Sequence, residues 1–147
     1  MKKLLVPPVF VLLTLILTVT FYFCCPKFNV IDFPYNLAGL LSVALGFAIM
    51  SKTWDLFKKH NTTLEIKPSS AMITEGVFAK SRNPMYIGMF LLLLGFGICS
   101  TNMLSILACF VFVLLVNGLV IPQEEKLMKE AFGQEYDAYK SKVRRWI

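Results

Sequence analysis

The chain has 147 residues, of which 56% are hydrophobic and 16% are charged, and its formal net charge is +6. A soluble domain carries charged residues over roughly a quarter to a third of its surface, whereas this chain has long segments without any charge. The composition therefore excludes an ordinary soluble domain and indicates a membrane protein. Because the basic residues lie close to the ends of apolar runs, they suit anionic lipid head groups, and we expect no nucleic-acid partner.

Four charge-free runs predict an all-α membrane protein with four transmembrane helices. The runs are residues 4–23, 37–51, 84–99 and 103–121. A helix needs about 20 mostly apolar residues to cross the hydrocarbon, and the first and fourth runs have this length. The second has it if Asn36, Lys52 and Trp54 lie at the interfaces, with the lysine snorkelling. The third is short, and Ser100-Thr101-Asn102 predicts a tight hairpin between it and the fourth.

The first run follows Lys2 and Lys3, as the apolar part of a secretory signal does. A cleavable signal has a shorter apolar region, about 7–15 residues, followed by small residues at the cleavage site. This run ends in Phe21-Tyr22-Phe23-Cys24-Cys25. We therefore expect a retained helix, kinked or started by Pro7-Pro8.

Lysine and arginine residues gather on one side of the predicted helices, and this asymmetry predicts the orientation. They precede the first helix, lie between the second and third, and follow the fourth. The connection 24–35 has only Lys27, balanced by Asp32, and the last hairpin has none. We predict a multi-pass protein whose termini and 57–83 connection face the cytoplasm, in the plasma membrane or, in a bacterium, the inner membrane.

Small residues predict two helix-packing faces. Ser42 and Gly46 have small-xxx-small spacing in the second helix, and Gly88 and Gly95 share a face of the third. The chain offers no metal-ligand spacing, so we expect no metal site. Its cysteine and histidine residues are scattered: Cys24, Cys25, Cys99, Cys109 and His60.

The segment after Pro122 predicts an amphipathic interfacial helix, or two short ones interrupted by Gly133. Its apolar and aromatic residues recur at helical intervals: Leu127, Phe132, Tyr136 and Tyr139. Trp146, beside Arg144 and Arg145, is typical of an anchor at the membrane interface.

The stretch SRNPMYIG, residues 81–88, places polar residues at the start of the third run. A structural interpretation makes Asn83 the N-cap and Pro84 the first helical residue, with Arg82 marking the cytoplasmic side. A functional interpretation rests on the tight hairpin, which brings the start of the third helix close to the end of the fourth. Polar residues then converge at one cytoplasmic mouth: Arg82, Asn83, Tyr86, Asn117, Glu124 and Glu125.

This set of groups predicts a ligand with several kinds of polar atom. A helix N-terminus with an arginine suits a carboxylate, and a glutamate suits ribose hydroxyls or an ammonium group. S-adenosylmethionine carries all of these groups.

The order ITEGVFAKSRNPMYIG, a helical hairpin and EEKLMKEAFGQEYDAYKSKVRRWI resembles the integral-membrane methyltransferases, which include the isoprenylcysteine carboxyl methyltransferases and the phospholipid N-methyltransferases. The likeness covers roughly residues 61–147 and implies a cofactor-binding loop, helical hairpin and amphipathic helix there, beside a two-helix scaffold of residues 1–60 in one membrane domain of residues 1–147. It implies an S-adenosylmethionine-dependent methyltransferase that acts on a small lipophilic acceptor at the cytoplasmic membrane face, among membrane lipids.

The resemblance also implies residue roles. Arg82, Pro84 and Tyr86 match the Arg-His-Pro-x-Tyr motif of the prenylcysteine enzymes, which makes Arg82 and Tyr86 catalytic. Asn83 replaces the histidine and does not titrate near neutrality. Phe78 stands where relatives often have a tyrosine. The cofactor-binding positions implied by the match are Ser70, Ala71, Met72, Ile73, Phe78, Asn83, Pro84, Met85, Tyr86 and Glu124.

One departure bears on the acceptor. The prenylcysteine-methylating relatives carry an arginine four residues before the cofactor glutamate, and here that position is Val120. A prenylcysteine carboxylate buried there would lack a cation. We expect instead a lipid-like acceptor that is methylated at an amine, a thiol or another group without a buried carboxylate.

Three alternatives belong to other classes. A small four-helix transporter is expected to carry an ionisable group at mid-membrane, and the four runs have none. A non-catalytic membrane scaffold does not account for the converging polar residues. A nicotinamide-dependent reductase is known among relatives of this fold, but the small size and the EE…FG…EY tail favour the methyltransferase.

Overall fold

The structure is a computed structural model, which describes residues 7–60 and 72–147. Within these residues the regular elements are helical, apart from an isolated bridge between Asn29 and Asn102. The α-helices are α1 (Pro7–Cys24), α2 (Ala38–Lys59), α3 (Pro84–Cys99), α4 (Met103–Leu115), α5 (Ile121–Phe132) and α6 (Gln134–Lys142). Short helical turns are η1 (Pro26–Phe28), η2 (Tyr35–Leu37), η3 (Gly76–Ala79) and the π-helical turn η4 (Val116–Val120).

The all-helical prediction is confirmed for the described residues. Segments Pro7–Cys24, Tyr35–Lys59 and Met103–Phe132 are long and apolar enough to cross a membrane, and Pro84–Cys99 is a shorter apolar helix. Many large apolar side chains of these helices face outward, as expected where hydrocarbon is the solvent. The count of four spanning helices stays a prediction.

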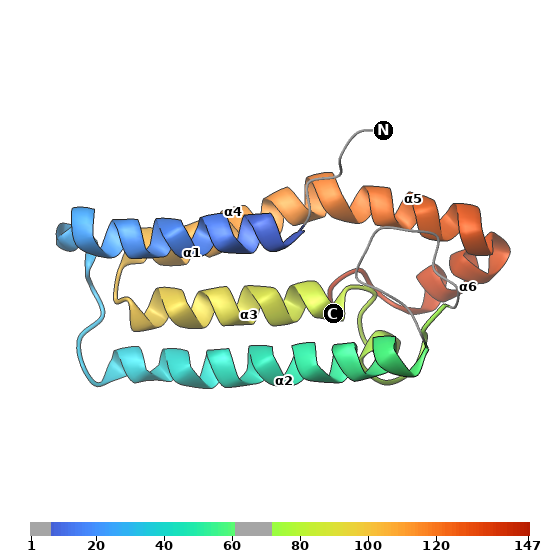
Figure 1. Cartoon of the computed structure of the whole chain (residues 1–147), viewed down its shortest axis with the longest axis horizontal. Coiled ribbons are helices and arrows are strands. Elements are labelled where there is room, and N and C mark those ends of the chain that lie inside the picture. Colours follow the sequence, from blue (N-terminus) through green and yellow to red (C-terminus); the bar gives the residue numbers. More distant parts are fainter. Residues whose placement is uncertain (1–6, 61–71) are drawn as a thin grey trace.

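The long helices lie side by side, with α3 between α2 and the α1–α4 pair (Figure 1). α5 continues from α4 beyond the end of the bundle, and α6 folds back toward α3 (Figure 1). α1 contributes Phe10 to the main apolar cluster. α3 contributes Met89 and Leu93, and the α4–α5 segment contributes Phe112 and Ile121. The core therefore joins helices from both ends of the sequence.

Glycines bring α2 and α3 into backbone contact. A methyl group on Gly46 would lie 2.7 Å from the carbonyl oxygen of Gly88, and one on Gly95 would lie 2.6 Å from that of Gly39. Ser42 Oγ donates a 2.7 Å hydrogen bond to a backbone carbonyl of α3. The predicted small-residue packing is confirmed, because only residues without a side chain permit this approach.

Asn102 joins α1 to the α3–α4 hairpin. This fully buried side chain donates from Nδ2 to the carbonyls of Phe21, at 3.1 Å, and Cys25, at 3.0 Å, and to Asn29 Oδ1, at 2.7 Å. Its Oδ1 accepts from the backbone N of Leu104 at 3.0 Å and so caps α4. The sequence predicts the tight hairpin but not these bonds.

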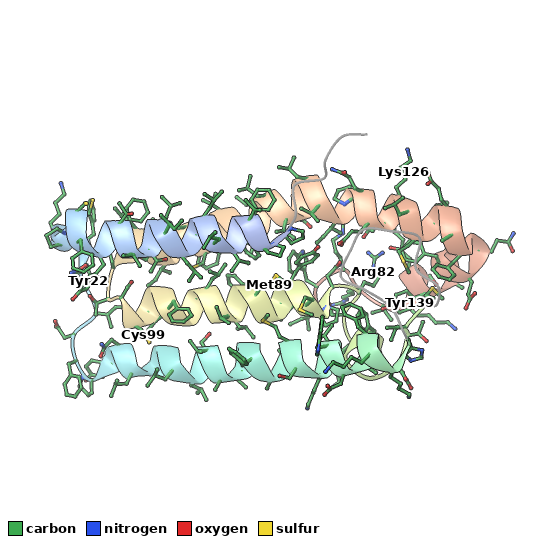
Figure 2. The ribbon with its side chains drawn as sticks, viewed as in Figure 1. Tyr22, Arg82, Met89, Cys99, Lys126 and Tyr139 are labelled. Carbon is green, nitrogen blue, oxygen red and sulfur yellow. The ribbon has the colours of Figure 1, made fainter. Side chains whose placement is uncertain are left out.

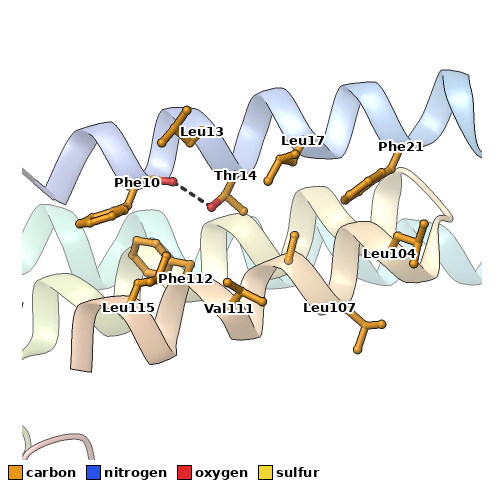
Figure 3. Close-up of a pocket in the computed structure, with 11 residues that line it drawn as sticks. Phe10, Leu13, Thr14, Leu17, Phe21, Leu104, Leu107, Val111, Phe112 and Leu115 are labelled. Atoms are coloured by element: carbon orange, nitrogen blue, oxygen red, sulfur yellow. Dashed lines mark hydrogen bonds between the residues drawn. The ribbon is translucent and has the colours of Figure 1, made fainter. Parts of the chain in front are cut away.

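An apolar groove of about 390 Å³ runs between α1 and α4 (Figure 3). Aliphatic and aromatic side chains line it, among them Leu13, Leu17, Leu107 and Val111. The hydroxyl of Thr14 also lies here, but it donates to the carbonyl of its own helix at 2.8 Å. The groove therefore suits hydrocarbon chains and offers no free polar group from Thr14.

The segment after Pro122 forms two helices, in agreement with the second version of the prediction. α5 ends at Phe132, and α6 begins at Gln134. Gly133 between them has φ +52°, in the left-handed region that glycine adopts without a steric cost. The placement of these helices at the membrane interface stays a prediction.

Replacing Gly95 with alanine should destabilise the protein. Alanine is a better helix former than glycine by about 1 kcal/mol, but the new methyl group would meet the carbonyl of Gly39, and such overpacking costs roughly 1–3 kcal/mol. Gly118 has open space around it and supplies the matched control, since Gly118→Ala should not lower stability. Circular dichroism of thermal unfolding in detergent micelles measures both. Equal midpoints for the two variants would contradict the packing argument.

Candidate functional site

Polar side chains gather where α3 begins and α5 turns into α6. Arg82 and Tyr139 lie at this end of the bundle, and Tyr22 and Cys99 lie at the other (Figure 2). We call this region the polar end. The structure brings the six predicted residues to this end in two bonded sets. Tyr86 bonds Glu124, and Arg145 links Arg82, Asn83, Asn117 and Glu125 by direct or shared hydrogen bonds and ion pairs.

Tyr86 and Glu124 form one pair at the polar end. Tyr86 lies in the first turn of α3, which Pro84 opens, and its side chain is buried. Its hydroxyl donates a 2.7 Å hydrogen bond to Oε1 of Glu124, in the first turn of α5. A short bond to a carboxylate fixes the orientation of both groups. The carboxylate keeps acceptor capacity for a further donor.

Arg82 and Glu125 form the second pair. Their side chains are only 9% and 12% exposed, and Nη1 of Arg82 lies 3.2 Å from Oε1 of Glu125. The same nitrogen donates to the hydroxyl of Tyr136 at 3.4 Å. Nε of Arg82 is buried and has no hydrogen-bond partner among the described residues. Since buried donors are nearly always paired, this nitrogen is available to a ligand.

Glu125 also receives two further cations. Arg145 donates from Nε to Oε1 and from Nη2 to Oε2, both at 3.0 Å, in the bidentate geometry that is strongest for this pair. Lys140, from α6, lies 3.4 Å from Oε2. One carboxylate of α5 therefore connects the segment that precedes α3, α6 and the segment that follows α6.

That segment, residues 143–147, lies against the start of α3, and we call it the strap. The carbonyl of Arg144 accepts from the backbone N of Arg82 at 3.0 Å. The carbonyl of Arg145 accepts from Asn83 Nδ2 at 2.9 Å and from Ser81 Oγ at 3.3 Å. Asn83 is the N-cap residue of α3 and Pro84 is the first helical residue, as the structural interpretation predicts, but the amide of Asn83 bonds to the strap and makes no side-chain cap. Nothing periodic in the sequence signals the strap.

Asn117 receives the end of the strap. Its Oδ1 accepts from Arg145 Nη1 and from Trp146 Nε1, each at 3.2 Å, and the indole packs against the apolar core. Trp146 thus has an internal partner, beyond the expected role as an interface anchor. Asn117 lies in η4, which interrupts the helix expected to run unbroken over residues 103–121. Pro122 lacks an N–H for the regular ladder, and the wider π turn ends two residues before it, at Val120.

The residues predicted to bind the cofactor through apolar contacts and loop positions have different surroundings in the structure. Ser70 and Ala71 lie outside the described residues. Met85 packs in the main apolar cluster, and the ring of Phe78 lies 5.7 Å from that of Phe57. The remaining apolar candidates are buried or half-buried: Met72, Ile73, Phe78, Pro84 and Met85.

Two contacts hold η3, which precedes the polar end. The hydroxyl of Tyr139 donates to the carbonyl of Phe78 at 2.7 Å. Burial raises the pKa of Tyr139 to about 12, so this donor stays protonated at neutral pH. On the other side, Glu75 accepts from Lys59 at 2.7 Å and bonds His60 at 2.9 Å. The hydrogen bond from Lys59, with one to His60, lowers the pKa of Glu75, which stays ionised.

The polar end can therefore bind a ligand that carries both charge signs. Arg82 offers a buried N–H, and Glu124 offers a fixed carboxylate. Among residues 7–60 and 72–147, no three His, Cys, Asp or Glu residues lie close enough together to hold a metal ion. The polar end offers phenol, amide, guanidinium and carboxylate groups.

Comparisons with known proteins identify relatives. The profile of the phospholipid methyltransferase family matches residues 34–135. Protein-S-isoprenylcysteine O-methyltransferase B of Arabidopsis thaliana is 31% identical over 109 residues, which are 71% of this chain and 55% of that protein. A probable protein-S-isoprenylcysteine O-methyltransferase of Oryza sativa is 30% identical over 84 residues, 57% of this chain and 44% of that protein.

A bacterial relative is shorter. An uncharacterized protein of Haemophilus influenzae is 40% identical over 63 residues, which cover that whole protein and 43% of this chain. The chain spans about half the length of the plant relatives.

Proposed function

Because this chain belongs to the phospholipid methyltransferase family, we propose that it is an S-adenosylmethionine-dependent methyltransferase acting on a lipophilic acceptor at the cytoplasmic membrane face. The observation that carries the proposal is the buried Arg82, whose Nε has no partner among the described residues. It lies at the same polar end as the Tyr86–Glu124 pair. A zwitterionic ligand needs such a donor and acceptor together.

The residues fit this cofactor. Arg82 Nε would hold the carboxylate of S-adenosylmethionine, and Glu124 would accept from its ammonium group or ribose hydroxyls. Met72, Ile73 and Met85 would supply apolar contacts, with further contacts proposed for Ser70, Ala71, Phe78, Asn83 and Pro84. When bound, the cofactor supplies an activated methyl group.

The chain itself would act by positioning. Tyr86 is held by Glu124, and Arg82 by Glu125, so neither side chain needs to reorganise when ligands bind. The apolar residues Val120 and Ile121 are buried beside them and limit water. Methyl transfer from a sulfonium is an in-line displacement, for which orientation and a shielded site supply most of the acceleration. Asn83, whose amide bonds the strap, has no part as a general base.

The acceptor is proposed to lack a buried carboxylate. Val120 is 2% exposed and lies in the main apolar cluster with Tyr86. The charge of Arg82 is balanced by Glu125. A prenylcysteine carboxylate buried beside Val120 would lack a cation, because the free Nε of Arg82 is assigned to the cofactor in this proposal. The plant relatives are named for isoprenylcysteine, and we propose for this chain a lipid-like amine, thiol or similar acceptor.

The membrane arrangement is part of the proposal. Residues 1–147 would form one membrane domain with four spanning segments, of which the last is the continuous helix Met103–Phe132, and the polar end would face the cytoplasm. The basic residues of α6 and the strap support this orientation.

Glu124→Gln should weaken binding of S-adenosylmethionine. Loss of a charged hydrogen-bond partner costs about 1.5–3 kcal/mol, which is roughly a ten- to hundredfold loss of affinity. Glu130→Gln is the matched control, because Glu130 lies on the same helix with a side chain that is 60% exposed. Calorimetric titration of detergent-purified protein with the cofactor and its demethylated product measures both. Unchanged affinity in a folded Glu124→Gln protein would refute the assignment, and no affinity in the wild type would refute the cofactor.

The acceptor class is tested by parallel methyl transfer. With labelled S-adenosylmethionine, the wild type should methylate phosphatidylethanolamine or a long-chain thiol in preference to a prenylcysteine analogue. Introducing a cation by Val120→Arg should raise activity on the prenylcysteine, if that variant folds. Efficient ester formation on the prenylcysteine by the wild type, above all other acceptors, would contradict the inference from Val120.

Orientation is tested by cysteine labelling in a background with the native cysteines replaced. An impermeant thiol reagent added to intact cells should label Tyr35→Cys, whose parent side chain is 76% exposed at the outer end. It should not label Ser141→Cys before the membrane is permeabilised. The reverse pattern would place the polar end outside the cell.

A further inference from the structure

Two of the three arginines of this chain share one carboxylate. Arg145 grips both oxygens of Glu125, at 3.0 Å each, while Arg82 reaches only Oε1, at 3.2 Å, through Nη1. The two guanidinium groups therefore make different numbers of contacts with the carboxylate. Arg145 takes the bidentate place and leaves Arg82 with one contact to the carboxylate.

The unequal contacts of the two arginines with Glu125 decide which N–H group of Arg82 is free to bind a ligand. An arginine facing a free carboxylate prefers two parallel N–H bonds, which can use Nε together with one terminal nitrogen. Were Glu125 free to turn, it could take Nε of Arg82 in this way. Because Arg145 occupies both carboxylate oxygens, Glu125 meets Arg82 through Nη1, and Nε stays without a partner among the described residues.

The strap keeps Arg145 in that place. Its backbone carbonyl is held by Asn83 and Ser81, and its Nη1 bonds Asn117 in η4. Trp146 adds a bond to the same Asn117 and packs on the core. The backbone of Arg145 is therefore fixed by the residues that precede α3, and its guanidinium is held by Asn117 of η4, independently of Glu125.

We infer that Arg145 is a positioning residue, which holds Glu125 so that Nε of Arg82 stays free for the anionic group of a ligand. The inference rests on the proposed function for the identity of that ligand, but the geometry can be tested without it. Arg145 itself touches neither donor nor acceptor in this account. It acts through Glu125 on Arg82.

The first test observes Arg82 directly. A chain with three arginines should give three Nε–H signals in an NMR spectrum of ¹⁵N-arginine-labelled protein in micelles, and single substitutions assign them. Arg145→Ala should move the Arg82 signal, because Nε gains a carboxylate partner. Arg144→Ala removes an equal charge from an exposed neighbouring side chain and keeps the backbone carbonyl, so it should leave the Arg82 signal in place.

The second test uses binding and turnover. Arg145→Ala should lower affinity for S-adenosylmethionine, or turnover with a fixed acceptor, by about tenfold, the effect of one charged hydrogen bond. Arg145→Lys should not restore it, since a point charge cannot grip both oxygens. In an Arg82→Lys background, Arg145→Ala should have no additional effect, whereas a merely structural role would add its loss to that of Arg82. Arg145→Gln, which keeps a donor for Asn117, replaces the alanine variant if that protein does not fold.

The outcomes distinguish a failure of the proposed function from a failure of the positioning role of Arg145. A wild type that neither binds S-adenosylmethionine nor transfers a methyl group overturns the proposed function, and the NMR result then decides the positioning role alone. An Arg82 signal that Arg145→Ala and Arg145→Gln leave unmoved overturns the positioning role. Additive losses with Arg82→Lys in an active protein overturn it as well.

Discussion

The polar end depends on the carboxylate of Glu125. This side chain is only 12% exposed, and it meets Arg82, Lys140 and Arg145. Partly buried charges are tolerated when they are paired and hydrogen-bonded, and here the pairing also fixes position. The segment before α3, α6 and the strap all reach this one group on α5. Without it, three cations would face one another at the end of the bundle.

The π turn η4 adds a second constraint. It precedes Pro122, where the regular helical ladder cannot continue, and it carries Asn117, which receives Arg145 and Trp146. A local irregularity of the backbone is thus used as the attachment point of the strap. π turns occur frequently at functional sites, and this one lies beside Glu124 and Glu125 in the sequence.

Structural features that follow from periodic or short-range sequence patterns were predictable. The apolar runs give the helices, the glycine spacing gives the α2–α3 contact, and the tight hairpin brings Arg82 close to Glu125. The strap was not predictable, because backbone carbonyls accept hydrogen bonds regardless of residue type. Asn102 shows the same limit: its sequence neighbours indicate a turn, whereas its partners belong to a helix near the start of the chain. The unequal contacts of Arg145 and Arg82 with Glu125 were not predictable either, because the spacing of residues in the sequence says nothing about side-chain geometry.

The bonds of Asn102 constrain the order of assembly in the membrane. Its Nδ2 meets the carbonyl of Phe21, 81 residues earlier in the chain, and Ser105 Oγ donates to the carbonyl of Thr18 at 3.3 Å. During synthesis, α1 therefore cannot complete these contacts until the α3–α4 hairpin has been made. α2 and α3 can meet earlier through their glycines. α1 thus precedes α2, α3 and α4 in the chain but is among the last of these helices to reach its final neighbours, a consequence of connectivity that the finished bundle conceals.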